Sequence, residues 1–369
     1  MGKAIFIASN GQNVGKTTSC LGILSGLRKR LKSVGFMKPV GQEHVQRSGG
    51  EFVDKDVHLF KEHFQLEDPA EVMSPVLFPQ GFTRDYLDGK IKHSELVASI
   101  KRSHSEISQR HDSLLIEGTG HVGVGSIAEL DNAKVASLLG VDVVIILSGG
   151  LGSSFDAFAL NKQMCDAHGV KIRGVILNRV IDSKRDMILT YMQKALDRFN
   201  IPIIGCIPYD SFLSNPTFGD FESLLKGEYI SGRKHRTRHF ADIRLIATSV
   251  EVFRKIVQPG MLVITPATRE DIIKATLEMH WTMQIKDPNS QSNFGMILTG
   301  HTPPSYAIID EMRKSDIPMI YASVNSYEAM RLIHSHTCKI RLEDKEKIAE
   351  AIDLVESHVD FDTLIDLMN

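Results

Sequence analysis

The residues best suited to chemistry lie at positions 9–18, which read Ser-Asn-Gly-Gln-Asn-Val-Gly-Lys-Thr-Thr. An apolar run at 4–8 precedes this segment, and leucine and isoleucine recur with helical spacing after it, at 21–31. A strand, a glycine-containing turn, Gly-Lys-Thr and a helix together are typical of a phosphate-binding loop. Backbone N–H groups and the helix start would hold phosphate oxygens there, so the segment predicts a nucleotide site; a turn in which Gly-Lys-Thr occurs by chance is the alternative.

Two side chains of this loop have distinct expected roles. Lys16 would contact the outer phosphates, and the Thr17 hydroxyl would bind Mg²⁺. We therefore predict that ATP and Mg²⁺ bind here. The residues of the loop predicted to bind the nucleotide are Gly11, Gln12, Asn13, Val14, Gly15, Lys16, Thr17 and Thr18.

Charged side chains also stand at the ends of two apolar runs. Glu117 ends the run 113–117 and precedes a glycine-rich segment, 118–125. A carboxylate at the carboxyl end of a parallel strand can hold Mg²⁺ or its water, although a turn or a helix cap is the alternative. Lys38 precedes Pro39 at the end of a second run, where a lysine can stabilise phosphoryl charge or a carboxylate acceptor, or lie on the surface without a role.

Three further polar residues are candidates with a common structural alternative. Asp54 and Asp56 open a helical pattern, and either could bind Mg²⁺ or cap the helix. Asn178 ends the strand pattern 174–177. Its amide offers a donor and an acceptor, which suit N6 and N7 of adenine, but asparagine at a strand end is also a common turn residue.

The elements that must position these residues alternate along the chain. Apolar runs predict strands, and amphipathic stretches between them predict helices. Strands separated by helices imply crossover connections and a mostly parallel sheet covered on both faces, an α/β fold of the P-loop NTPase type. The strands are expected at 4–8, 34–40, 113–117, 142–147, 170–178 and 203–207, and the helices at 94–109, 132–139, 155–168 and 183–199.

A second, smaller α/β domain should follow, because the alternation resumes after 208–216. We place the boundary so that residues 1–214 form the nucleotide-binding domain and residues 215–369 form the second. The basic cluster 233–239 is either a solvated loop or helix end, or a contact to a phosphate ligand or a subunit. The strands are expected at 243–248, 261–265, 294–299 and 318–322, and the helices at 270–280, 306–315, 326–334 and 344–357.

Composition narrows the class of protein. The chain has 369 residues, a formal net charge of −2 and 42% hydrophobic residues, which gives no reason to expect a nucleic-acid or membrane partner. The four cysteines are scattered without metal-binding spacing, which fits a reducing cytoplasm and no structural zinc. His334 and His336 are two positions apart and would diverge on a helix, so we interpret them as surface or hydrogen-bonded residues.

The first part of the chain resembles the dethiobiotin synthetase family of P-loop proteins, from Lys3 to about Pro208. The similarity rests on a long loop of the form G-x5-G-K-T with Ser9 as its first residue, and on the segments 36–40, 116–120 and 175–178. It implies that Lys16 and Lys38 are catalytic and that Thr17, Asp56 and Glu117 hold Mg²⁺. The serine on the substrate side of that family is replaced here by Gln42.

Nearly the whole chain is similar to the N-terminal half of long-form phosphotransacetylases. That half joins a dethiobiotin-synthetase-like domain to a DRTGG domain. The similar segments are 36–42, 259–266, 297–300, 317–318 and 339–341. The DRTGG letters are degenerate, with Thr268-Arg269 and Thr299-Gly300-His301 in their place.

Two functions compete on these grounds. The first is a nucleotide-sensing or regulatory module of acyl-phosphate or central metabolism, cytoplasmic and homo-oligomeric. The second is an ATP-dependent ligase of the dethiobiotin synthetase or cobyrinic acid a,c-diamide synthase type, acting on a small amine or carboxylate metabolite. An acetyltransferase is not expected, because the sequence holds no transferase domain, and Gln42 argues against dethiobiotin synthesis.

Overall fold

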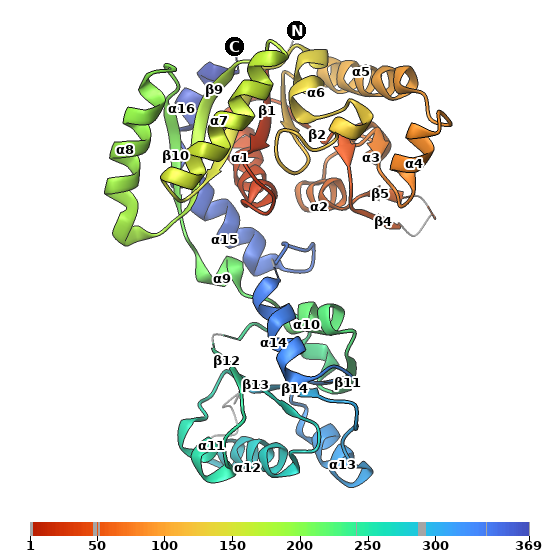
Figure 1. Cartoon of the computed structure of the whole chain (residues 1–369), viewed down its shortest axis with the longest axis vertical. Coiled ribbons are helices and arrows are strands. Elements are labelled where there is room, and N and C mark those ends of the chain that lie inside the picture. The colour runs from red at the N-terminus through yellow and green to blue at the C-terminus, as the bar shows by residue number, and fades with distance from the viewer. Residues whose placement is uncertain are drawn as a thin grey trace. The chain divides into compact units, whose positions relative to one another are not determined.

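The computed structural model of the chain describes residues 3–46, 50, 52–240, 242–286, 293–336 and 338–368. The chain divides into two compact units. The first unit contains residues 1–210 and 340–369, and the second contains residues 211–339. Each unit is an α/β layer structure built on its own sheet (Figure 1).

A six-stranded parallel sheet forms the centre of the first unit, in the strand order β10-β9-β8-β1-β7-β2. All six strands predicted for this domain are present. They are β1 (Lys3–Ser9), β2 (Val34–Met37), β7 (Ser113–Glu117), β8 (Val143–Ser148), β9 (Ile172–Val180) and β10 (Ile203–Pro208). The strand predicted at 34–40 is interrupted at Pro39, whose ring nitrogen has no hydrogen to donate, and the chain continues as the short β3 (Val40–Gly41).

Helices cover the two faces of this sheet unequally. Four crossover helices cover one face of the sheet, and their apolar side chains form one continuous core with it. They are α5 (His93–Arg110), α6 (Asn132–Leu139), α7 (Gly152–Ala167) and α8 (Arg185–Asp197). The other face receives one crossover helix, α1 (Lys16–Arg30), which contacts β1, β7 and β2. Right-handed crossovers produce this distribution, because β2 lies on one side of β1 while β8, β9 and β10 follow on the other side.

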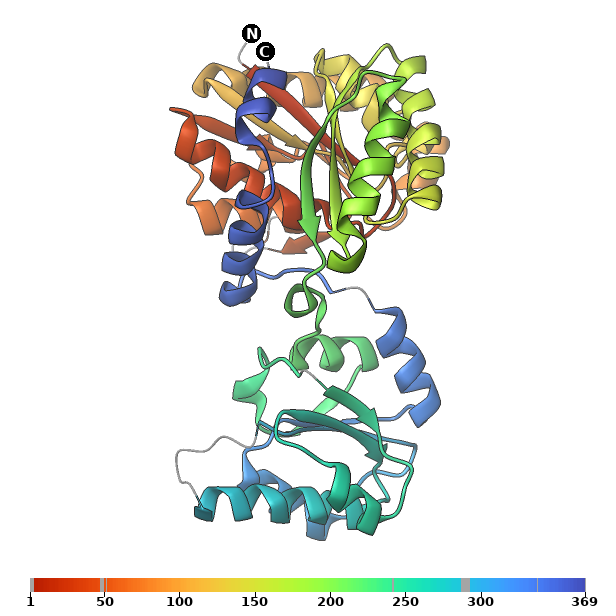
Figure 2. The ribbon, with the colours of Figure 1, turned by 90° about the vertical axis from the view of Figure 1, so that its left-hand side faces the viewer.

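The end of the chain covers that second face over β9 and β10. Helix α15 (Lys345–Glu356) packs along α1 and contacts β10, and α16 (Phe361–Leu367) contacts β9 and β10. Figure 2 shows these two helices beside α1 and the edge of the sheet. The helix expected at 344–357 is therefore present, but it belongs to the first unit, whereas the sequence-based boundary places it in the second domain. Without it, β9 and β10 would expose one apolar face.

Two glycines allow α15 and α16 to approach α1 closely. A Cβ atom added to Gly22 would lie 2.3 Å from Cβ of Val355, and one added to Gly26 would lie 2.2 Å from Cζ of Phe361. Such distances lie far inside van der Waals contact, so any side chain at these positions would push the helices apart. An ion pair of 2.6 Å between Lys29 and Glu356 adds a polar contact at the rim of this interface.

Smaller elements follow β2 and lead to β7. They hold the segment that contains Lys38, Asp54 and Asp56. These elements are β4 (His44–Gln46), β5 (Phe52–Asp54), α2 (Lys55–Phe64), α3 (Ala70–Met73), β6 (Val76–Leu77) and α4 (Phe82–Leu87). The short strands pair as β3 with β6 and β4 with β5.

The second unit is built on a five-stranded sheet, in the order β11-β15-β14-β13-β12. Its strands are β11 (Glu228–Ser231), β12 (Asp242–Leu245), β13 (Met261–Pro266), β14 (Gly295–Thr299) and β15 (Met319–Ala322). Only β11 is antiparallel to its neighbour. This arrangement confirms a second, smaller α/β domain, although the antiparallel edge strand β11 and two helices, at 218–225 and 250–256, are absent from the sequence-based prediction.

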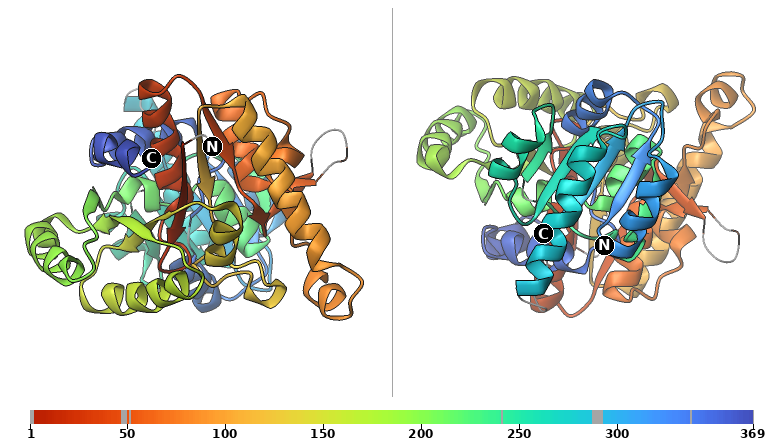
Figure 3. Two further views of the ribbon diagram at one scale, coloured as in Figure 1. Left: turned by 90° about the horizontal axis from the view of Figure 1, so that it is seen from above. Right: turned by 90° about the horizontal axis from the view of Figure 1, so that it is seen from below.

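Helices cover both faces of this sheet as well. One face packs against α11 (Val250–Ile256), α12 (Glu270–Lys286) and α13 (Tyr306–Ser315), which lie side by side in the right-hand view of Figure 3. The other face packs against α10 (Phe218–Leu225) and α14 (Ser326–Ser335). Within the basic cluster 233–239, Lys234 pairs with Asp316 at 2.6 Å, and Arg233 lies 3.9 Å from Glu222.

Candidate functional site

The phosphate-binding loop joins β1 to α1 at the carboxyl end of the parallel sheet. Gly15 is the residue before the helix and has φ of 90° and ψ of 28°, a left-handed conformation that favours glycine. A Cβ atom at Gly15 would also lie 2.3 Å from Nδ2 of Asn178. The first turn of α1 contains no acidic residue, so no side chain of the helix's own first turn offsets the positive end of its N–H groups.

Thr17 and Glu117 are in direct contact. The Thr17 hydroxyl donates to Oε1 of Glu117 over 2.8 Å, although the two residues are 100 positions apart in the chain. The second carboxylate oxygen of Glu117, Oε2, is buried and has no hydrogen-bond partner among the described residues. A buried carboxylate oxygen without a donor is an expected partner for a cation. Lys16 stands beside this pair and donates to the carbonyl of Gly120 over 3.3 Å.

The electrostatics of Glu117 reflect burial in a crowded site. Burial and the nearby carboxylate of Asp56 raise the pKa of Glu117 to about 7, against the opposing effect of Lys38, Lys16 and the hydrogen bond from Thr17. Burial of the ammonium lowers the pKa of Lys16, although the charge of Glu117 opposes this shift. Both shifts show that the site holds charged groups at an energetic cost, which a bound cation and a polyanion would offset.

Lys38 lies between two carboxylates. Its Nζ donates to Oδ1 of Asp54 over 3.0 Å and to Oδ2 of Asp56. Burial alone would lower the pKa of Lys38, but the charges of Asp56 and Asp54 outweigh this effect and raise the pKa of the ammonium. Asp54 also caps α2 by accepting from the backbone N–H groups of Asp56 and Val57, so the capping alternative holds for Asp54.

The predicted metal ligands are thus connected through two sets of contacts. Thr17 and Glu117 are bonded to each other, and Asp56 joins the same charged cluster through Lys38 and through its effect on the pKa of Glu117. The assignment of Asp56 as the third ligand stays a prediction. Gln42 lies exposed in the loop after β3.

Asn178 contacts the phosphate-binding loop. Its Nδ2 donates to the carbonyl of Val14 over 2.7 Å, and its Oδ1 accepts from the backbone N–H of Arg179. An asparagine amide has two N–H groups and an oxygen with two lone pairs, so these bonds leave capacity for a base. The contact with adenine therefore stays a prediction, and the structure adds a loop-positioning role.

Two buried asparagines that support the site were not predicted from the sequence. Asn132, on α6, bonds both the N–H and the carbonyl of Thr119 and so fixes the glycine-rich segment 118–125. Asn161, on α7, bonds Val122 of that segment and the carbonyl of Asn10 in the loop. An asparagine on the apolar face of a helix was the available signal, because a buried amide requires partners.

The state of Glu117 leads to a pH-dependence prediction. The carboxyl ionises near its ordinary pKa of 4.5 in the unfolded chain but retains its proton to about pH 7 in the folded chain. The folded state therefore binds more protons between these values, and the free energy of unfolding should fall by about 3 kcal/mol as pH rises from 4.5 to 7. Glu117→Gln stays neutral, so this part of the fall should be missing in the variant.

Hydrogen exchange of the β7 amides, measured without Mg²⁺ or nucleotide, would test this prediction. The single tryptophan, Trp281, lies in the second unit, and its fluorescence serves as the internal control for a change confined to the first. The same pH slope in wild type and Glu117→Gln would contradict the assignment.

Comparison with known proteins agrees with this geometry. The family model described as AAA domain matches residues 3–217, more than half of the chain. The chain belongs to this family. A second model, the DRTGG domain, matches residues 221–336.

The relatives confirm both resemblances. The phosphate acetyltransferase of Nitrosomonas europaea is 26% identical over 98% of this chain and 51% of its own length. The ATP-dependent dethiobiotin synthetase of Nitrosopumilus maritimus is 26% identical over 61% of this chain and 100% of its own length. The chain thus spans about half the length of the phosphate acetyltransferases that it matches, and corresponds to their N-terminal half.

Solved structures show a looser likeness. The MinD cell division protein of Aquifex aeolicus matches 57% of this chain and 84% of its own length, with 18% identity and a TM-score of 0.35.

Within the described part of the chain, no helix combines the length and the apolar character that crossing a bilayer requires.

Proposed function

We propose that the first unit binds ATP with Mg²⁺ and that the chain is a nucleotide-sensing or regulatory module of acyl-phosphate or central metabolism. One observation carries the nucleotide-binding part. The Thr17 hydroxyl, the carboxylate of Glu117 and the ammonium of Lys16 meet at a left-handed Gly15 and a helix start without acidic residues. A hydroxyl and a carboxylate on one side and a lysine on the other match the needs of a metal–polyphosphate pair.

The residues present fit a Mg²⁺ ion. All candidate donors are oxygens, as Mg²⁺ prefers, and Oε2 of Glu117 is a buried acceptor without a hydrogen-bond partner among the described residues. Thr17 and Glu117 would hold the ion, and Asp56 would join them. The ion would offset the charge of the outer phosphates. Lys16 would contact these phosphates directly, and the loop N–H groups would orient them.

The regulatory part of the proposal draws on the relatives. The chain matches an AAA domain followed by a DRTGG domain, and it is similar to one half of phosphate acetyltransferases. These similarities support a role in acyl-phosphate metabolism. We propose that nucleotide binding in the first unit alters the shape or the association of the protein, as a homo-oligomer.

Calorimetry of the purified chain tests nucleotide binding. ATP should bind in a manner that requires Mg²⁺, and GTP should bind more weakly if the Asn178 amide pairs with N6 and N7 of adenine, as we predict. An absence of ATP binding at millimolar concentrations with Mg²⁺ would refute the proposal. Equal affinity for both nucleotides would refute the role of Asn178 alone.

An ATP-dependent ligase is the alternative, and Lys38 is the observation that favours it. Lys38 is buried and affects the pKa of both Lys16 and Glu117, which supports a second cation near the phosphate site that would contact an acceptor carboxylate or carbamate. ATP turnover that depends on bicarbonate with a small amine, or on a carboxylate, would favour the ligase over the sensor. Dethiobiotin formed from 7,8-diaminononanoate at enzyme-like rates would identify the ligase directly.

A further inference from the structure

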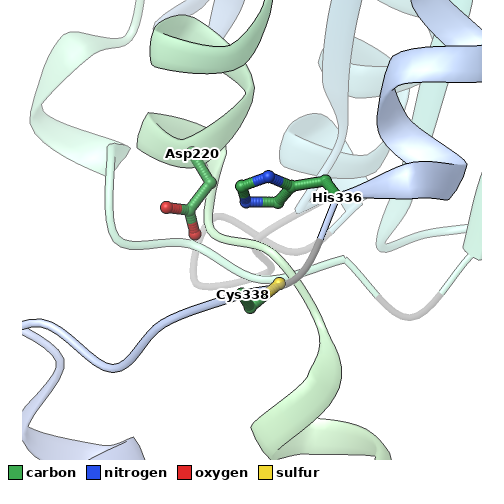
Figure 4. Close-up of side chains that lie close together, drawn as sticks. All are labelled: Asp220, His336 and Cys338. Carbon is green, nitrogen blue, oxygen red and sulfur yellow. The ribbon is translucent and has the colours of Figure 1, made fainter. Parts of the chain in front are cut away.

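A second set of possible metal ligands lies in the second unit, away from the phosphate-binding loop in sequence. The carboxylate of Asp220, the imidazole of His336 and the thiol of Cys338 each offer one ligand atom, and these atoms lie within 4.8 Å of one another. Figure 4 shows the three side chains converging from the first turn of α10 and from the segment that follows α14. Asp220 is 3% exposed, and the other two are half-buried.

Local structure holds the carboxylate of Asp220 in place. Thr217 and Asp220 form a capping box at the start of α10, in which Oδ2 of Asp220 accepts from the backbone N–H and the hydroxyl of Thr217 over 2.8 and 2.9 Å. At known metal sites, hydrogen bonds of this kind orient a carboxylate ligand. The capping box therefore restricts the carboxylate to one orientation, in which a ligand oxygen lies near His336 and Cys338.

The position of His336 explains why its spacing from His334 was misleading. Helix α14 ends at Ser335, and His336 is the first residue after it, with extended backbone angles of −74° and 132°. His336 and Cys338 therefore both lie outside the helix, and the ligand atom of each lies within 4.8 Å of the carboxylate of Asp220. His334 stays on the exposed surface of the helix.

We propose that Asp220, His336 and Cys338 bind a divalent transition-metal cation of the zinc class, with water as the fourth ligand. The donor set determines the class of metal, because a thiolate and an imidazole favour Zn²⁺ over Mg²⁺ or Ca²⁺. Ligands of a tetrahedral zinc ion lie about 3.4–3.8 Å apart, given metal–ligand distances of about 2.0–2.3 Å. The three atoms therefore need to move closer by at most about 1–1.4 Å, which side-chain rotation can supply.

Metal binding would exchange a proton for the ion. The Cys338 thiol now donates to the carbonyl of Ser214 over 3.1 Å. When the metal binds, the thiol proton leaves to solvent, a metal–sulfur bond forms, and the hydrogen bond to Ser214 is lost. Affinity should therefore increase with pH. The ion would connect α10, near the start of the second unit, to the segment that ends this unit at residue 339.

Titration of the metal-free protein with Zn²⁺ and with Co²⁺ tests the site. We expect one equivalent of either metal per chain, with the Co²⁺ form showing thiolate-to-metal charge-transfer absorption. Cys338→Ser, His336→Ala and Asp220→Asn should each weaken binding by about 100-fold or more, beyond the effect typical of outer-shell changes. Asp220→Asn retains an acceptor for Thr217, and His334→Ala is the matched control that should bind as wild type does.

Wild-type protein alone gives a second test that does not depend on variant folding. One equivalent of Zn²⁺ should protect Cys338 from alkylation, as mapped by mass spectrometry, and leave the reactivity of Cys20, Cys165 and Cys206 unchanged. The proposal is overturned if wild type binds neither metal, if Cys338 is not protected, or if any of the three ligand variants retains full affinity.

Discussion

Lys16→Ala is expected to weaken ATP binding by about 30- to 5,000-fold. This range corresponds to about 2–5 kcal/mol, the usual loss when one member of a buried charge pair is truncated. The physical reason is that Lys16 is the cation beside Thr17 and Glu117 at the start of α1, where the outer phosphates would lie. Calorimetry with Mg²⁺ and ATP measures the change directly.

Two comparisons separate lost binding from lost folding. Lys90→Ala removes an exposed lysine paired with Asp85 and should bind ATP as wild type does. Lys16→Ala should unfold at a temperature no lower than wild type without nucleotide, because burial already disfavours the charge of this ammonium. Equal ATP affinity in Lys16→Ala and wild type would show that the loop does not bind the outer phosphates.

Removal of the last 30 residues is expected to unfold the first unit, although it leaves every residue of the predicted nucleotide site in place. Between positions 348 and 368 the segment buries six large apolar side chains that at about 1.5 kcal/mol each amount to about 9 kcal/mol, comparable with the net stability of a whole domain. They are Ile348, Val355, Val359, Phe361, Leu364 and Met368. A chain ending at Lys339 should lose the cooperative circular-dichroism transition of the first unit and retain the Trp281 fluorescence transition of the second.

A fused chain is the matched control for this truncation. Residues 1–210 joined to residues 340–369 by a flexible linker of about 15 residues, which spans roughly 19–23 Å, should fold and bind ATP. Residues 1–210 alone should not fold. If the chain ending at Lys339 melts cooperatively in its first unit, α15 and α16 are not needed by that unit.

A single substitution tests the same interface more gently. Gly26→Val places a side chain where Phe361 now lies, so it should destabilise the first unit by about 1–3 kcal/mol or more. Gly152→Ala, at the start of α7 with no atom near the added Cβ, should be neutral or slightly stabilising.

The convergence of the candidate site residues Lys16, Thr17 and Glu117 was predictable because its signals are local. Strand, turn and helix around Lys16 are adjacent in sequence, and the rule that strands end at one edge of a parallel sheet places Glu117 near Thr17 without further information. The pairing of Lys38 with both Asp54 and Asp56 was not predictable, because it depends on how the segments after β2 fold back.

The domain boundary and the Asp220 cluster required the tertiary structure. An amphipathic helix at 345–356 shows that an apolar face is buried, but not against which sheet. This helix packs on the first sheet because one face of that sheet has a single crossover helix, α1, and because the glycines of α1 allow close approach. Similarly, Asp220 lies more than 100 positions from His336, and no spacing pattern links them.

The return of the chain to the first unit has a consequence for synthesis on the ribosome. About 130 residues of the second unit separate β10 from α15. The ribosome must therefore synthesise the second unit before α15 and α16 can cover the sheet of the first. At about 5–20 residues per second, this delay lasts roughly 7–26 s. During this interval β9 and β10 expose an apolar face, so the nascent chain should recruit chaperones that bind hydrophobic segments until residues 340–369 emerge.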